Sequence, residues 1–189
     1  MPLFNRKGRE RAVAEGVYGA IVAQARSPAF YTDFGVPDTL EGRFEMIVLL
    51  ACLYFRRLRS EDEAIRSLGQ TVFDTMFRDM DASLRELGVG DLSVPKKIKA
   101  MGEAFYGRAG AYDAALAEAE DRALAEALAR NIWPEQPEAE SRGAALAGWV
   151  RTAETALAEQ PGETFRSEGP GFPAPGLARS SPALQAVQP

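Results

Sequence analysis

The feature that most constrains the fold is a run of ten apolar residues, Met46 to Phe55, which is followed directly by Arg56 and Arg57. A membrane-spanning helix needs about 20 apolar residues, so this run is too short to cross a bilayer. A helix that is apolar on all sides and is not in a membrane is typical of the centre of a helical bundle. We therefore expect a helix over residues 39–59 that other helices bury, with Cys52 as a core residue.

The rest of the chain shows helical periodicity. Val13, Val17 and Ile21 recur every four residues, and the apolar residues from Phe73 to Leu87 follow each other at alternating spacings of three and four. No segment alternates with a period of two for long enough to form a strand. The sequence thus predicts an all-α fold, a single bundle of about six helices. The expected helices cover residues 6–26, 39–59 and 60–87, a segment from 93 to a break at 107–110, and then 111–130 and 138–160.

Capping patterns mark two of the expected helix starts. Asp38 with Glu41, and Ser60 with Glu63, have the spacing of a capping box, in which the first side chain accepts from the backbone of the first turn. Gly88 marks the end of the helix that Ser60 opens, because glycine accepts the left-handed conformation that often ends a helix.

Glycine and proline indicate where helices are interrupted. We expect a bend at Gly69 and a break over 107–110, where Gly107 and Gly110 lie three residues apart. Six prolines and few large apolar residues follow from Pro161 onward. This composition predicts a helical domain over 1–160 and a disordered tail over 161–189.

Composition argues against an enzyme. The chain contains no histidine and one cysteine, which excludes His-dependent nucleophilic catalysis, His-bearing zinc sites and CxxC redox pairs. We expect neither a cofactor nor a metal. The net charge of -5 disfavours DNA as a partner, because contacts to phosphate require a surplus of basic residues. The start of the chain lacks the apolar segment of a signal peptide.

Three aspartates, Asp74, Asp79 and Asp81, could suggest a metal or acid–base cluster. At the helical period, however, Asp79 lies about 140° from Asp74, whereas Asp74 and Asp81 share one side of the helix. Arg78 and Arg85 interleave with these two aspartates. The pattern favours a ladder of surface ion pairs over a cation site.

Two basic features leave a binding role and a structural role open. Lys96, Lys97 and Lys99 are three of only four lysines, and they lie in a first helical turn, where the helix dipole disfavours cations. Tyr106 is expected to point away from the apolar stripe, and Arg108 lies near Lys97 in helical projection. Exposed tyrosine and arginine are common at protein interfaces, but a solvated surface explains them equally well.

Several ordered blocks resemble the ubiquinol–cytochrome c chaperone family. They are DTLEGRF (38–44), FDTMFRDMD (73–81), LRELGVGD (84–91) and KIKAMGEAFYGR (97–108). The resemblance covers residues 17 to 131, whereas the region after Pro134 lies outside it.

The resemblance implies an assembly chaperone for the ubiquinol–cytochrome c reductase (bc1) complex of the respiratory chain. It implies newly made, immature cytochrome b as the client, with the ribosome near its tunnel exit and a small partner protein as further partners. A bacterial member is expected to act in the cytoplasm, at the cytoplasmic face of the inner membrane, with peripheral contact to the membrane and no transmembrane segment. The motif residues that we assign to a partner-binding surface are Glu41, Arg43, Asp79, Asp91, Lys97, Tyr106 and Arg108.

Two other interpretations remain open at this point. A ribosome- or RNA-associated factor would use Lys96 to Lys99 and Arg108 as a phosphate-facing patch. A structural or regulatory adaptor subunit would instead stay in the mature respiratory complex. Co-purification separates the three, because only a chaperone captures immature cytochrome b transiently.

Overall fold

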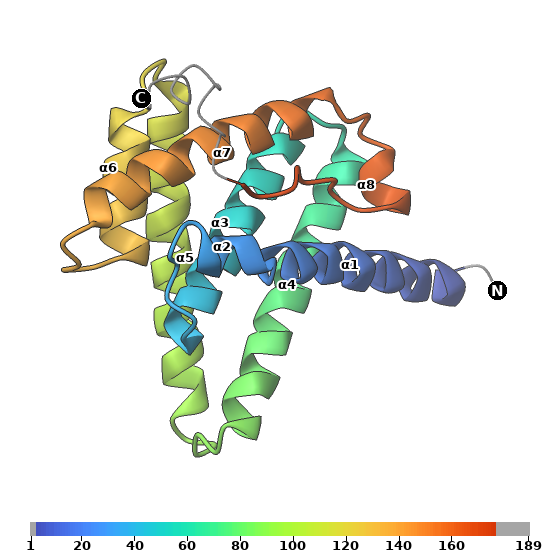
Figure 1. Cartoon of the computed structure of the whole chain (residues 1–189). Helices are drawn as coiled ribbons and strands as arrows, with labels where there is room; N and C mark the ends of the chain where they lie inside the picture. Colours follow the sequence, from blue (N-terminus) through green and yellow to red (C-terminus); the bar gives the residue numbers. More distant parts are fainter. Residues whose placement is uncertain (1–2, 177–189) are drawn as a thin grey trace, which may run out of the picture.

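The computed structural model describes residues 3–176, which form eight helices and no strand (Figure 1). Six of these helices have eleven residues or more, which confirms the all-α fold and the expected number of main helices. They are α1 (Leu3–Ala25), α3 (Leu40–Leu58), α4 (Glu63–Glu86), α5 (Val94–Ala117), α6 (Arg122–Ile132) and α7 (Ala139–Glu159). Two short helices, α2 (Pro28–Thr32) and α8 (Thr164–Ser167), complete the set.

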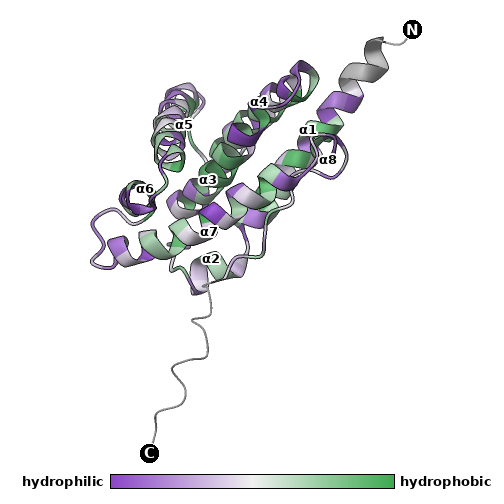
Figure 2. Ribbon diagram, turned by 90° about the horizontal axis from the view of Figure 1, so that it is seen from above, coloured by the Kyte–Doolittle hydropathy of each residue, from purple (hydrophilic) through white to green (hydrophobic). Residues whose placement is uncertain are grey.

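Helix α3 lies at the centre of the bundle. It packs against α1, α4, α5, α6 and α7, and Figure 2 shows these helices arranged around it. The apolar run occupies this helix, and every residue from Val48 to Tyr54 is buried. The expected central helix is therefore confirmed, and so is the core position of Cys52.

Helices α6 and α7 pack closely against each other near the start of α7. A Cβ atom on Gly143 of α7 would lie 2.4 Å from the carbonyl oxygen of Ala125 on α6, so only glycine allows this approach. Beyond the end of α6, the indole Nε1 of buried Trp133 donates to the carbonyl oxygen of Gly35 at 2.7 Å. This bond fixes the connection between α2 and α3 against the bundle.

The helix starts expected from the sequence are displaced by one or two residues. The N-cap of α3 is Thr39, whose hydroxyl accepts from the Gly42 amide at 3.1 Å, while Asp38 instead pairs with Arg43. The N-cap of α4 is Asp62, which accepts from the Ile65 amide at 2.9 Å. In both cases a second residue of capping type stands one or two positions after the first, and spacing alone does not choose between them.

The break expected over 107–110 is wrong, and Gly69, where we expected a bend, lies within a continuous helix. Helix α4 is continuous through Gly69, where a Cβ would meet Leu58 Cδ1 at 2.9 Å, so this glycine serves close packing against α3. Helix α5 continues to Ala117. At this end, Arg151 of α7 donates to the carbonyl oxygens of Leu116 at 2.8 Å and Glu118 at 2.6 Å, which satisfies acceptors that have no partner within the helix.

The boundary expected at Pro161 is too early. Residues 161–176 continue along the bundle, and Phe165 of α8 is fully buried, with its ring 5.9 Å from that of Tyr54 and with Arg57 stacked on it. Farther along, Gln24 of α1 donates from Nε2 to the carbonyl oxygen of Pro173 at 3.0 Å. One buried phenylalanine and a few polar contacts dock a segment whose composition suggested disorder. The rest of the expected tail, residues 177–189, lies outside the described residues.

Helices α4 and α5 form a long antiparallel hairpin whose far end projects from the bundle (Figure 1). The connection begins with a Schellman motif, in which the Val89 amide donates to the Leu84 carbonyl and the Gly88 amide to the Arg85 carbonyl. Gly88 has a φ of 80°, as this motif requires, so the end expected at this glycine is confirmed.

Candidate protein-binding groove

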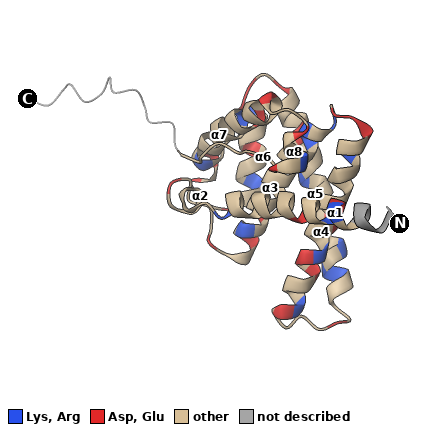
Figure 3. Ribbon diagram, turned by 90° about the vertical axis from the view of Figure 1, so that its right-hand side faces the viewer, with Lys and Arg blue, Asp and Glu red and all other residues tan. Residues whose placement is uncertain are grey.

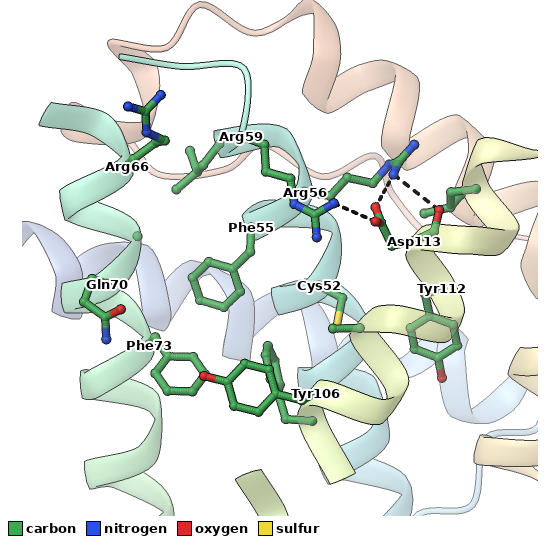
Figure 4. Close-up of a pocket in the computed structure, with 15 residues that line it drawn as sticks. Cys52, Phe55, Arg56, Arg59, Arg66, Gln70, Phe73, Tyr106, Tyr112 and Asp113 are labelled. Atoms are coloured by element: carbon green, nitrogen blue, oxygen red, sulfur yellow. Dashed lines mark hydrogen bonds and ion pairs between the residues drawn. The ribbon is translucent and has the colours of Figure 1, made fainter. Parts of the chain in front are cut away.

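An open groove of about 320 Å³ lies where α3, α4 and α5 meet (Figure 4). Its floor is aromatic: Phe55 comes from α3, Phe73 from α4, and Phe105 with Tyr106 from α5. The Phe73 ring lies 6.1 Å from Phe55, 5.4 Å from Phe105 and 5.9 Å from Tyr106. We call this site the aromatic groove. A cavity of this volume and lining takes one or two large apolar side chains rather than a whole helix.

Tyr106 forms part of the groove while remaining open to solvent. Its side chain is 66% exposed, whereas the neighbouring Phe105 is buried. The two rings meet edge to face with centroids 5.6 Å apart, so Phe105 holds the tyrosine in position from below. An exposed aromatic ring on a rigid floor is typical of an interface anchor, because little side-chain entropy is lost on binding.

One side of the groove carries positive charge. Arg59 donates from Nη1 to Oδ2 of Asp113 at 2.6 Å, and Arg56 contacts the same carboxylate and also Glu154 of α7. Hydrogen bonding from Arg59, with a contribution from Arg56, holds the pKa of Asp113 below its usual range. Arg66, also on the rim, is exposed and donates to the Glu61 carbonyl. The apolar floor is thus bordered by guanidinium groups that can contact polar or acidic parts of a bound chain.

Cys52 lies at the base of the groove but is not a reactive group. It is buried among apolar side chains, and this burial raises the pKa of its thiol to about 12. The nucleophilic thiolate is therefore essentially absent at neutral pH. Among residues 3–176, no three His, Cys, Asp or Glu side chains come together in a way that could hold a metal ion.

A second groove, of about 190 Å³, lies on another side of the hairpin, where α1 and the start of α3 face α4 and α5. Tyr18, Arg43, Phe44 and Asp79 are among its lining residues. The hydroxyl of Tyr18 donates to Oδ2 of Asp79 at 2.8 Å. Burial, together with this hydrogen bond to a carboxylate, raises the pKa of the tyrosine.

The residues assigned to a partner surface do not form a single cluster. Tyr106 lines the aromatic groove, while Arg43 and Asp79 line the second groove. Glu41 is exposed in the first turn of α3.

The other assigned residues lie along the hairpin. Asp91 pairs with Arg85 at the hairpin end, and exposed Lys97 follows in the first turns of α5. Arg108 has a structural partner: its Nε lies 2.6 Å from Oε2 of buried Glu45. The expected ladder forms only in part, since Arg85 pairs with Asp81 while Arg78 bonds to Thr75.

Sequence reasoning missed Phe55 and Phe73 as groove residues. Each falls on the apolar stripe of its helix, which indicates burial, and each is in fact only partly buried. Their juxtaposition depends on the crossing of α3 and α4, which no local spacing encodes. The sequence feature that could have indicated the groove is the density of aromatic residues in the segments that form α3 and α4.

None of the helices formed by residues 3–176 combines the length and the hydropathy that a membrane crossing requires. An all-helical fold with an open aromatic groove beside an exposed tyrosine is an arrangement typical of protein-binding modules. Residues 32–172, about three quarters of the chain, match the model of the ubiquinol-cytochrome C chaperone family. The chain therefore belongs to this family, which confirms the resemblance seen in its motifs; the family is one of chaperones rather than enzymes.

Two relatives support this assignment. The crystal structure of the Cbp3 homolog from Brucella abortus is similar with a TM-score of 0.78 and 41% sequence identity, covering 90% of this chain and 94% of that chain. The ubiquinol-cytochrome-c reductase complex assembly factor 1 of Xenopus laevis is 25% identical over 135 residues, which is 71% of this chain and 67% of the relative. The match to the family extends past Pro134, beyond the region that the motifs indicated.

Proposed function

We propose that this protein is an assembly chaperone of the bc1 complex that binds newly made cytochrome b through the aromatic groove. The observation that carries the proposal is the exposed ring of Tyr106, fixed on an apolar floor in a member of a chaperone family. The name of the Xenopus laevis relative, a reductase complex assembly factor, supports the same role.

The groove suits a client with apolar segments. A newly made membrane protein exposes large apolar side chains until its helices pack. Binding in the groove would remove one or two of these side chains from water, which is favourable. Release requires that binding be modest, and a groove of about 320 Å³ buries too little surface to hold a client permanently. We place this activity at the cytoplasmic face of the inner membrane, a location supported by the bacterial origin of the 41% identical relative.

Deletion of the gene tests the function as a whole. We expect the deletion strain to lose most haem-loaded cytochrome b and bc1-dependent respiration, while a bc1-independent quinol oxidase keeps working. A normal reduced-minus-oxidised haem b spectrum in that strain would refute the proposal. Stoichiometric retention of the protein in the purified mature complex would identify it as an adaptor subunit instead.

A substitution in the groove tests the site. Tyr106→Asp places a charge where the apolar client side chain should lie, and the exposure of Tyr106 allows the fold to tolerate the change. We expect recovery of immature cytochrome b with the tagged chaperone to fall at least tenfold, a loss of about 1.4 kcal/mol.

Leu40→Asp is the matched control, because Leu40 is 58% exposed and lies in the second groove. It should leave capture unchanged. The opposite pattern, with capture lost in Leu40→Asp and kept in Tyr106→Asp, would move the client site to the second groove.

A further inference from the structure

The end of the α4–α5 hairpin carries the two most exposed leucines among the described residues. Leu92 is 98% exposed and Leu87 is 62% exposed. Both lie in the connection between the helices, which projects from the bundle (Figures 1 and 3). We call residues 85–99 the hairpin tip.

The tip is locally basic in an acidic protein. Residues 85–99 contain four basic residues (Arg85, Lys96, Lys97 and Lys99) and two acidic residues (Glu86 and Asp91). Their net charge is therefore +2, in a chain whose net charge is -5. Arg85 pairs with Asp81 and Asp91, and Lys99 lies 3.7 Å from Glu103. Lys96 and Lys97 are exposed and take part in no ion pair within the described residues.

The backbone holds this arrangement in place. The Schellman motif at Gly88 fixes the exit from α4, and the Gly90 carbonyl oxygen accepts from the Ser93 amide at 2.7 Å, which fixes the entry to α5. Val94 is fully buried and anchors the first turn of α5. Leu92 is therefore presented outward by an ordered turn, two residues before the buried anchor.

From this combination we infer that the hairpin tip inserts into the interface of an anionic lipid bilayer. Leu92 and Leu87 would enter the acyl boundary. Lys96 and Lys97 lie within about 5 Å of Val94 along the helix axis, at a rise of about 1.5 Å per residue. Their long side chains would therefore place the ammonium groups at the level of the lipid phosphates when the leucines are inserted. Exposed leucines in the turn, with two unpaired lysines in the helical turn that follows, match a surface that is apolar inside and negatively charged outside.

The same features fit RNA less well. Sequence-tolerant RNA binding uses aromatic side chains that stack on bases, and residues 85–99 contain none. The exposed Leu87 and Leu92 side chains would gain nothing from contact with a phosphate backbone, whereas an acyl layer would bury them.

This inference does not depend on the proposed function, because the tip and the aromatic groove share no residue. The first experiment is co-sedimentation of the full-length protein with vesicles of phosphatidylcholine and phosphatidylglycerol, and with vesicles of phosphatidylcholine alone. We expect binding to the anionic vesicles only, and its loss at about 1 M salt, where the Debye length is about 3 Å.

Two tip variants identify the surface. Leu92→Asp should lower vesicle binding at least tenfold, because a charge replaces the inserted side chain. Lys96→Ala with Lys97→Ala should lower it about 25-fold, since each lysine near an anionic surface contributes about fivefold. Tyr106→Asp and Arg122→Ala, which change exposed side chains away from the tip, should bind vesicles like the unaltered protein.

A tryptophan at the tip reports insertion directly. The two native tryptophans, Trp133 and Trp149, are buried, so their emission should not respond to vesicles. In Leu92→Trp we expect a blue shift with anionic vesicles and quenching by brominated acyl chains.

Three results would overturn the inference. The first is equal binding to both vesicle types, or binding that survives Leu92→Asp. The second is binding of an RNA oligonucleotide through Lys96 and Lys97 without any vesicle binding. The third is loss of cytochrome b capture in detergent by Leu92→Asp without vesicle binding, which would make the tip a client site. Loss of capture in Tyr106→Asp with normal vesicle binding would leave both proposals standing.

Discussion

Arg108 and Glu45 form an ion pair inside the bundle that joins α5 to the central helix α3. Nε of Arg108 lies 2.6 Å from Oε2 of Glu45, and a second guanidinium nitrogen contacts Oε1. Glu45 is only 8% exposed at its side chain, and its burial raises the pKa of the carboxyl although Arg108 acts in the opposite direction. The arginine thus neutralises a charge that the core could not otherwise hold.

A double-mutant cycle measures this relationship. Arg108→Met should lower the free energy of unfolding by about 3 kcal/mol, because it leaves a buried carboxylate without a partner. Glu45→Met combined with Arg108→Met should regain most of that loss, since two apolar side chains of similar length need no compensation. Urea denaturation followed by circular dichroism gives both values. The control is Arg122→Met on the surface of α6, which should leave the midpoint unchanged; additive single effects would contradict the coupling.

The position of Arg108 shows what a sequence can and cannot predict. Helical projection placed it near Lys97, which suggested a shared basic surface. Its partner stands 63 residues earlier, and only the crossing of α3 and α5 brings the two together. The central helix, in contrast, was predictable, because ten consecutive apolar residues must be buried wherever the other helices lie.

The ends of the helices and the docking of residues 161–176 also divide into features that local sequence predicts and features that depend on distant residues. Gly88 ends α4 through a local backbone motif, and the sequence predicted it correctly. The glycines at 107 and 110 gave a wrong indication, because α5 continues through them to Ala117. The carbonyl oxygens at that end accept from Arg151, more than thirty residues away, a contact that local sequence does not reveal. The docking of Phe165 likewise requires a cavity formed by other helices.

Truncation tests the docked segment. A chain that ends at Gln160 should melt several degrees below a chain that ends at Gly176, because only the longer one retains Phe165 in its cavity. Phe165→Ala in the full chain should cost about 3 kcal/mol or more, the usual loss for a buried phenylalanine. Differential scanning calorimetry checks both comparisons. Equal melting temperatures for the two truncated chains would mean that residues 161–176 do not stabilise the bundle.

The rim of the aromatic groove should make stability depend on pH. Asp113 has a folded-state pKa below its unfolded value of about 3.9, chiefly because Arg59 donates to it. Its stabilisation is therefore fully present above about pH 4 and is lost as the pH falls through the lower, folded-state pKa.

Asp113→Asn removes this contribution. We expect the variant to lose roughly 1 kcal/mol at pH 7, or about 2–4 °C in melting temperature, as is usual for a partly exposed ion pair. The difference from the unaltered protein should close under strongly acidic conditions. Glu126→Gln, in the exposed pair with Arg122, is the control and should show little difference at any pH. A difference that stays constant from pH 7 to strong acid would show that packing, not charge, is responsible.

A matched pair of substitutions in α3 tests the central position of this helix. Leu50 is completely buried, whereas Leu40, in the first turn of the same helix, is largely exposed. Leu50→Asp would place an unpaired carboxylate in the core at a cost of several kcal/mol, which is comparable to the whole stability of a domain. Leu40→Asp places the same group at a helix N-terminus, where water solvates it and the helix dipole favours it.

We expect Leu50→Asp to be insoluble or to have lost its cooperative thermal transition, and Leu40→Asp to melt at or slightly above the temperature of the unaltered protein. Helical content by circular dichroism and the midpoint of thermal unfolding distinguish these outcomes. If Leu50→Asp kept its full helicity and a sharp transition, the face of α3 at Leu50 would be open to solvent. The binding surface would then have to be sought on that face instead of beside Tyr106.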